Sequence, residues 1–189
     1  MKIPKWLKIV GLLIIGLWLL FKFVAWPMLQ KETKKISAEK TTTYTEQSYD
    51  LSVTYSSPSK KGRVIFGDLV PYDTVWRTGA NEPTTFTTGT PMKILNNELP
   101  AGTYSLWTKP GPKNWTVMFN EEVPEWGVTL LSMGKETARN PEKDVVEVDI
   151  LSKSLASPQE QFTIAFQDTG LLHLALSWDE TIILVPISK

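Results

Sequence analysis

Apolar and polar residues alternate through most of the chain after residue 48, and this period of two most constrains the fold. In Tyr49–Tyr55 the odd positions are apolar or aromatic, and the even positions are Asp, Ser and Thr. Side chains of a strand point alternately to its two faces, so the pattern predicts a strand with one buried face. The alternation recurs in segments 103–107, 115–119, 145–150, 162–166, 172–178 and 183–187.

About nine or ten such short strands, at hairpin spacing and without a convincing amphipathic helix, are typical of an antiparallel sheet. We therefore predict an all-β domain over residues 46–189, an antiparallel β-sandwich or a barrel-like sheet. The chain has no cysteine, which excludes disulfides, thiol catalysis and Cys-ligated metals. A domain of this length can bury its core without such cross-links.

The N-terminus is apolar enough to enter a membrane. Ile9–Phe21 carries no charge, and the apolar stretch Trp6–Trp26 has the length that a bilayer requires, about 20 residues. Lys22 lies near one end, where its charge can reach the headgroups. We predict that residues 1–30 form a cytoplasmic tail and one transmembrane helix. The alternative is a cleaved signal peptide, but Val24–Pro27 is a poor cleavage site because it contains Trp and Pro.

Charge is divided unevenly along the chain. Residues 1–40 carry eight Lys against two Glu, a net charge of +6, and because the whole chain is neutral the remainder carries −6. An acidic domain repels phosphates, so we expect no nucleic-acid partner. The lysines before the apolar stretch favour an N-terminus inside the cell and a domain outside the cytoplasm. Residues 31–45 are polar, and we predict a linker there.

The segment Pro71–Phe86 joins two predicted strands and holds Arg77, one of three arginines. Asn81 and the glycine two residues before it tolerate left-handed backbone, which predicts a tight loop. In one interpretation Arg77 offers its planar guanidinium to a carboxylate or phosphate, with Asn81 and Glu82 as polar partners. The other, which we prefer from the sequence, is a buried ion pair of Arg77 with Glu82 or Asp73 that locks a corner of the fold.

Two tryptophans are further candidates for ligand binding. Trp107 is out of phase with the apolar Tyr104 and Leu106, and Trp126 follows a run of glutamates. Aromatic faces of this kind stack on sugars or apolar ligands, although packing in the core is the alternative for each.

Catalytic groups are sparse. Glu121, Glu122 and Glu125 lie just before Trp126, and a pair of carboxylates beside an aromatic ring would suit glycoside hydrolysis. A solvated acidic loop is the alternative. His173 is the only histidine, no Gly-x-Ser-x-Gly is present, and no phosphate-binding glycine motif occurs. We therefore expect no metal site and no cofactor.

Several runs of the domain together match a known pattern. They are Gly62–Gly67, Val70–Tyr72, Trp76–Glu82, Leu99–Leu106, Trp115–Val117, Phe119–Asn120 and Trp126–Gly127. The chain resembles the bacterial family called domain of unknown function (DUF) 2911 over roughly 48–187, and Trp-Arg-x-Gly-Ala-Asn-Glu is the specific piece. The resemblance implies an exported bacterial protein. The family name assigns no activity, so no catalytic residue is carried over, and the anchor departs from the cleaved signal that many such proteins would carry.

Two functional hypotheses follow. The first is a non-catalytic binding or scaffold domain, anchored as a single-pass protein in the bacterial inner membrane, with its C-terminal domain periplasmic or extracytoplasmic. Its partners would be membrane lipid around the helix and a small-molecule or glycan ligand. The second is a hydrolase of envelope glycans that uses two of Glu82, Glu121, Glu122 and Glu125.

Overall fold

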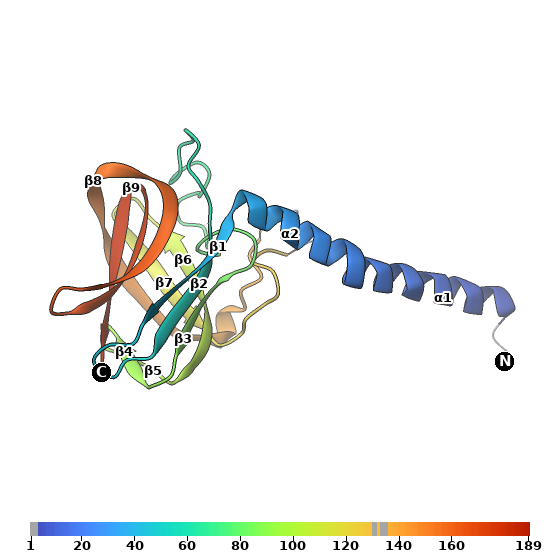
Figure 1. The fold of residues 1–189 in the computed structure, drawn as a ribbon, viewed down its shortest axis with the longest axis horizontal. Coiled ribbons are helices and arrows are strands. Elements are labelled where there is room, and N and C mark those ends of the chain that lie inside the picture. Colours follow the sequence, from blue (N-terminus) through green and yellow to red (C-terminus); the bar gives the residue numbers. More distant parts are fainter. Residues whose placement is uncertain (1–3, 130–131, 133–135) are drawn as a thin grey trace. The chain divides into compact units, whose positions relative to one another are not determined.

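The computed structural model describes residues 4–129, 132 and 136–189 (Figure 1). The chain forms two compact units, which meet in the sequence between Ile36 and Ser37. Each unit has its own architecture, a helix in the first and an antiparallel sheet in the second.

The first unit is a continuous run of helix. It comprises α1 (Lys5–Leu20), a π-helical turn (Phe21–Ala25) and α2 (Trp26–Ile36). The wider turn ends two residues before Pro27, whose ring would clash with the carbonyl four residues earlier in a regular α-helix. The whole run is long and apolar enough to cross a membrane, which is compatible with a membrane anchor or a signal sequence.

The second unit is a nine-stranded sheet in which all neighbouring strands are antiparallel, with the order β1-β2-β3-β6-β7-β8-β9-β4-β5. The predicted all-β antiparallel fold is confirmed, and the sheet does not close into a barrel. The strands are β1 (Ala38–Tyr44), β2 (Leu51–Ser57), β3 (Thr84–Thr88), β4 (Met92–Ile94), β5 (Asn97–Leu99), β6 (Gly102–Pro110), β7 (Asn114–Asn120), β8 (Asp144–Asp168) and β9 (Leu172–Ser188).

The long strand β8 turns the sheet back on itself. Its first part, up to Leu151, pairs with β7, and from Ser152 onward it pairs with β9. Register shifts on both sides of Gln159 interrupt the second ladder, which is how β-bulges bend a strand. The Phe162 amide donates to the Pro58 carbonyl at 2.9 Å, so the end of β2 meets the middle of β8. Figure 1 shows β8 arching beside β9.

Inward-facing side chains from both parts of the curled sheet form one hydrophobic core. The residues predicted to alternate inward along β9 are buried, from Leu172 to Ile187, while His173 is only half-buried. An aromatic cluster fills one part of the core, and Trp76 stacks on Trp178 with ring centroids 6.1 Å apart. Its other ring contacts include Phe66, Trp115 and Phe162.

Residues 31–45, predicted to be a linker, have regular structure instead. The helix continues to Ile36, and Ala38–Tyr44 forms the edge strand β1. β1 pairs with all seven residues of β2. An edge strand with mostly exposed side chains needs few apolar residues. The polar composition of β1 therefore gave the sequence pattern of a linker.

Candidate functional site

The candidate site is built on a loop that leaves the sheet beside β6. Trp76 bridges Thr108, and Thr84 at the start of β3 pairs with Leu106, so both ends of the loop lie along the same side of β6. The Thr84 amide donates to the carbonyl of Arg77 at 3.3 Å, which closes the base. We call Arg77–Pro83 the Arg77 loop.

Hydrogen bonds from the surrounding framework hold the Arg77 loop. Thr78 is fully buried, and its hydroxyl lies 3.1 Å from that of Thr108. The Thr84 hydroxyl donates to the Thr78 carbonyl at 2.6 Å, and the Trp76 indole N–H donates to the Gly79 carbonyl at 3.0 Å. Both donors belong to residues that are fixed in the sheet or its core, so these hydrogen bonds hold the loop backbone in one conformation.

The Arg77 loop contains strained backbone. Thr78 and Asn81 have φ of 56° and 60°, in the left-handed region that a β-branched residue such as Thr rarely adopts. Gly79 has φ of 150°, and a Cβ there would lie 2.8 Å from the Ser56 carbonyl oxygen, so only glycine fits. Conformations of this kind cost about 1–3 kcal/mol each and cluster at ligand-binding and catalytic sites.

Arg77 points away from the core. Trp76 faces inward, and successive side chains along an extended segment alternate, so Arg77 lies on the outward face that Trp107 also occupies. The Arg77 side chain is half-buried, and its Nε atom is buried without a hydrogen-bond partner. Burial lowers the pKa of the Arg77 guanidinium, because removal from water disfavours the charged form.

Arg77 takes no part in the ion pairs of the described sheet domain. Among the described residues it forms no ion pair, and the residues outside the description include no Asp or Glu. The ion pair with Glu82 or Asp73 that we preferred from the sequence is therefore not observed. Glu82 is half-buried in the same loop, but spacing along the chain does not determine where two side chains point.

Arg139 shows how this fold accommodates a paired buried arginine. Its Nε donates to Asp144 Oδ1 at 3.1 Å, and its Nη2 donates to the second carboxylate oxygen. Only 11% of the Arg139 side chain and 10% of the Asp144 side chain are exposed. The Asn120 amide donates a further hydrogen bond to Asp144 at 2.7 Å. Arg77 has none of these compensating contacts.

The segment around Gly127 lies directly against the Arg77 loop. The Gly127 amide donates to the Asn81 carbonyl at 3.1 Å. A Cβ on Gly127 would lie 2.4 Å from Arg77 Cδ and 2.9 Å from the Asn81 oxygen, so a side chain there would collide with the loop. This contact brings half-buried Trp126 into the region of Arg77 and Asn81. The sequence pattern did not single out Gly127 as a contact residue, although a glycine can mark a position where another backbone approaches closely.

Residues 37–187 match the family described as "Protein of unknown function (DUF2911)". The chain belongs to the DUF2911 family. The matched region spans the sheet from β1 into β9 and includes both the Arg77 loop and Gly127, so the resemblance found in the sequence is confirmed. No curated protein and no solved structure matches the chain.

Within the DUF2911 domain Trp107 has a structural position. It is fully buried but lies outside the main core, on the outward face of β6 beside its cross-strand partner Met118. Its indole N–H donates to the Ser105 hydroxyl at 2.7 Å, and that hydroxyl donates to the Glu122 carbonyl at 2.7 Å. Trp107 therefore supports the segment that begins at Glu121 and does not offer its ring to a ligand.

The glutamates before Trp126 also hold this segment in place. Glu121 pairs with Lys143 at 2.9 Å, and the Asn140 amide donates to Glu122 at 3.2 Å. Glu125 is exposed. In the described part of the DUF2911 protein, no group of three or more His, Cys, Asp or Glu residues could hold a metal ion.

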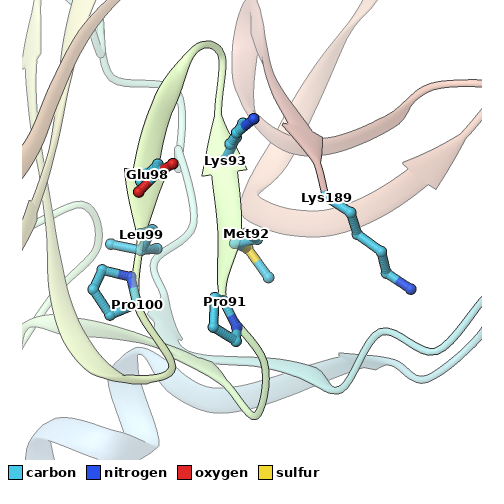
Figure 2. Close-up of a pocket in the computed structure, with 7 residues that line it drawn as sticks. All are labelled: Pro91, Met92, Lys93, Glu98, Leu99, Pro100 and Lys189. Carbon is cyan, nitrogen blue, oxygen red and sulfur yellow. The ribbon is translucent and has the colours of Figure 1, made fainter.

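A separate pocket of about 310 Å³ lies at the β4–β5 hairpin (Figure 2). Its floor includes the buried Met92 and Leu99, and its charged residues are Lys93, Glu98 and Lys189. Figure 2 shows the Lys93 and Lys189 side chains extending in different directions. None of the site residues expected from the sequence lines this pocket.

Proposed function

We propose that this DUF2911 protein is a membrane-anchored binding module on the outer side of the bacterial inner membrane, without catalytic activity of its own. The observation that carries the proposal is that Arg77 is half-buried while its Nε atom has no hydrogen-bond partner among the described residues. A partly desolvated guanidinium without a carboxylate is unfavourable, because burial removes hydration that no ion pair replaces. A partner from outside the chain would supply the missing interaction.

The rigidity of the Arg77 loop supports a binding role. Side chains that recognise a ligand bind best when the backbone carrying them is already ordered, since less freedom is lost on binding. Hydrogen bonds from Trp76 and Thr84 provide that order, and the Gly127 amide adds a further hydrogen bond to the loop at the Asn81 carbonyl. The strain at Thr78 is of the kind that persists at functional loops.

The anchor and its orientation belong to the same proposal. The helical run Lys5–Ile36 has the required length and apolarity. The tight group of lysines before it favours an N-terminus in the cytoplasm, and the poor cleavage site favours retention of the helix. These features together support a sheet domain that lies outside the cytoplasm.

No specific observation favours the glycan hydrolase. That chemistry needs two carboxylates facing each other across a cleft. Glu121 and Glu122 are engaged with Lys143 and Asn140, which makes them anchors of their own segment. Binding without catalysis is therefore the better-supported function.

The test uses the full chain purified in mild detergent. Thermal unfolding is followed by tryptophan fluorescence, with and without a small-molecule extract of a bacterial envelope. We expect the extract to raise the midpoint for wild type and for Arg63→Met, because Arg63 is exposed and bonds only to nearby backbone carbonyls. Arg77→Met should lose the response. An equal response of wild type and Arg77→Met would remove Arg77 from the proposed site.

A further inference from the structure

We propose that the group held by Arg77 is a carboxylate of a small ligand, an inference that rests on the binding function proposed above. The guanidinium is a planar fork of N–H donors that matches the two oxygens of a carboxylate. Arg139 and Asp144 form such a pair inside this domain, so the fold already contains a working example of the geometry. At Arg77 the arginine is present, and the described residues supply no ion pair to it.

The backbone beside Arg77 offers further donors. Among the described residues no acceptor takes up the amide N–H groups of Gly79, Ala80 and Asn81. Gly79 and Asn81 are buried, so these donors are poorly placed to bond with bulk water. Successive N–H groups in a turn with left-handed residues form a concavity that attracts anions. These amides therefore favour an anionic ligand, as Arg77 does, and they do so independently of Arg77.

The charge of the domain restricts the anion. Residues 37–189 carry 13 Lys and Arg against 19 Asp and Glu, a net charge of −6, and Glu82 lies within the loop itself. A phosphate dianion or a polyanion would meet this negative field, whereas a singly charged carboxylate meets it with the least repulsion. The chemistry is therefore that of a small organic acid or of a carboxylate at one end of a larger ligand.

Arginine Nε–H resonances provide a direct measurement. The chain has three arginines, Arg63, Arg77 and Arg139, so the arginine region of a ¹⁵N spectrum should contain three such resonances, each assignable with a single Arg→Lys variant. The full chain in detergent is titrated with sodium acetate as the probe, and sodium chloride keeps the ionic strength constant. We expect the Arg77 resonance to shift in a saturable manner. The Arg139 resonance should remain in place because Asp144 already occupies its guanidinium.

Sodium phosphate at the same ionic strength is the second arm, and we expect at least about tenfold weaker binding than for acetate. Gly79→Ala supplies a third arm, because it disturbs the free amides while it leaves the guanidinium unchanged, and it should weaken acetate binding. Saturable binding of acetate that the Arg77→Met variant loses would support the proposal.

Three outcomes would overturn it. They are an Arg77 resonance that acetate does not move, equal shifts of Arg77 and Arg139, and tighter binding of phosphate than of acetate. If acetate has no effect while Arg77→Met is more stable than wild type, the carboxylate inference fails and the binding function remains. If Arg77→Met strongly destabilises the domain, Arg77 is structural and both proposals fail.

Discussion

Replacement of the two buried arginines by methionine should have opposite effects on stability. Methionine keeps much of the length and apolar stem of arginine, so Arg77→Met and Arg139→Met remove a charge without opening a large cavity. The stem matters at Arg77, where Gly127 packs against its Cβ and Cδ atoms. Alanine would combine loss of charge with loss of this contact, and its effect would be ambiguous.

The magnitudes follow from the partners of each arginine. Arg77→Met removes one buried donor without a partner, whose cost is about 1–3 kcal/mol, and part of the guanidinium is hydrated, so we expect stability to rise by about 1 kcal/mol. Arg139→Met leaves Asp144 nearly buried with only Asn120 as a strong donor, which should cost about 3–5 kcal/mol. For a domain of this size, 1 kcal/mol corresponds to about 2–4 °C in the unfolding midpoint.

The assay is urea unfolding of the sheet domain, Ser37–Lys189, followed by the fluorescence of its tryptophans. Equal slopes for the variants would show that the midpoints report stability and not a change in the unfolded state. The reasoning is refuted if Arg77→Met lowers the free energy of unfolding by more than about 1 kcal/mol, or if the two substitutions have similar effects. Either result would mean that Arg77 has a stabilising partner in the folded domain.

Three other predictions concern different parts of the chain. Gly127→Ala would place a Cβ 2.9 Å from the Asn81 carbonyl oxygen and should cost about 1–3 kcal/mol in a thermal melt. A hydrogen bond to Asp168 raises the pKa of Tyr44 to about 12, so Asp168→Asn should return its titration, read by ultraviolet absorbance, towards 10. The Tyr44–Asp168 hydrogen bond stabilises the fold while Tyr44 is protonated and Asp168 is ionised. Its contribution is lost as Tyr44 ionises between about pH 10 and 12, and as Asp168 is protonated below about pH 4. The full chain should sediment with membranes and resist extraction by carbonate, while the fragment Ser37–Lys189 should stay soluble. Release of the protein expressed from the full chain into the periplasmic fraction would show that the helix is cleaved off.

Local patterning predicted much of the core. Val146, Val148 and Ile150 alternate with exposed neighbours and are buried, because β8 has one face inward over this stretch. The same patterning missed β1, since an edge strand derives its order from backbone hydrogen bonds to β2, and backbone groups leave no trace in side-chain composition. A fragment that began at Thr41 would cut through β1, so the soluble domain should begin at Ser37.

The sequence predicted the loop that carries the candidate site, but not the contacts around it. The residues of the Arg77 loop were found because Gly and Asn mark a tight turn and because arginine is rare in this chain. The alternation also placed Trp107 on the outward face correctly. The segment that follows β7 returns to β6, where the Ser105 hydroxyl donates to the Glu122 carbonyl and accepts from the Trp107 indole. No local pattern contains such a long-range contact.

The departures from local rules coincide in one place, and this coincidence is the strongest reason to regard the Arg77 loop as functional. Thr78 adopts a backbone conformation unfavourable for a β-branched residue. Within the part of the chain that the structure describes, the amides that follow it have no acceptor and Arg77 has no ion pair. Arg139 obeys the rule for buried charge, which shows that the sequence can satisfy an arginine where only stability is required. In natural proteins such local costs persist where a function needs them. A ligand that supplies a carboxylate would relieve the two electrostatic deficits together, whereas a purely structural loop would leave both uncompensated.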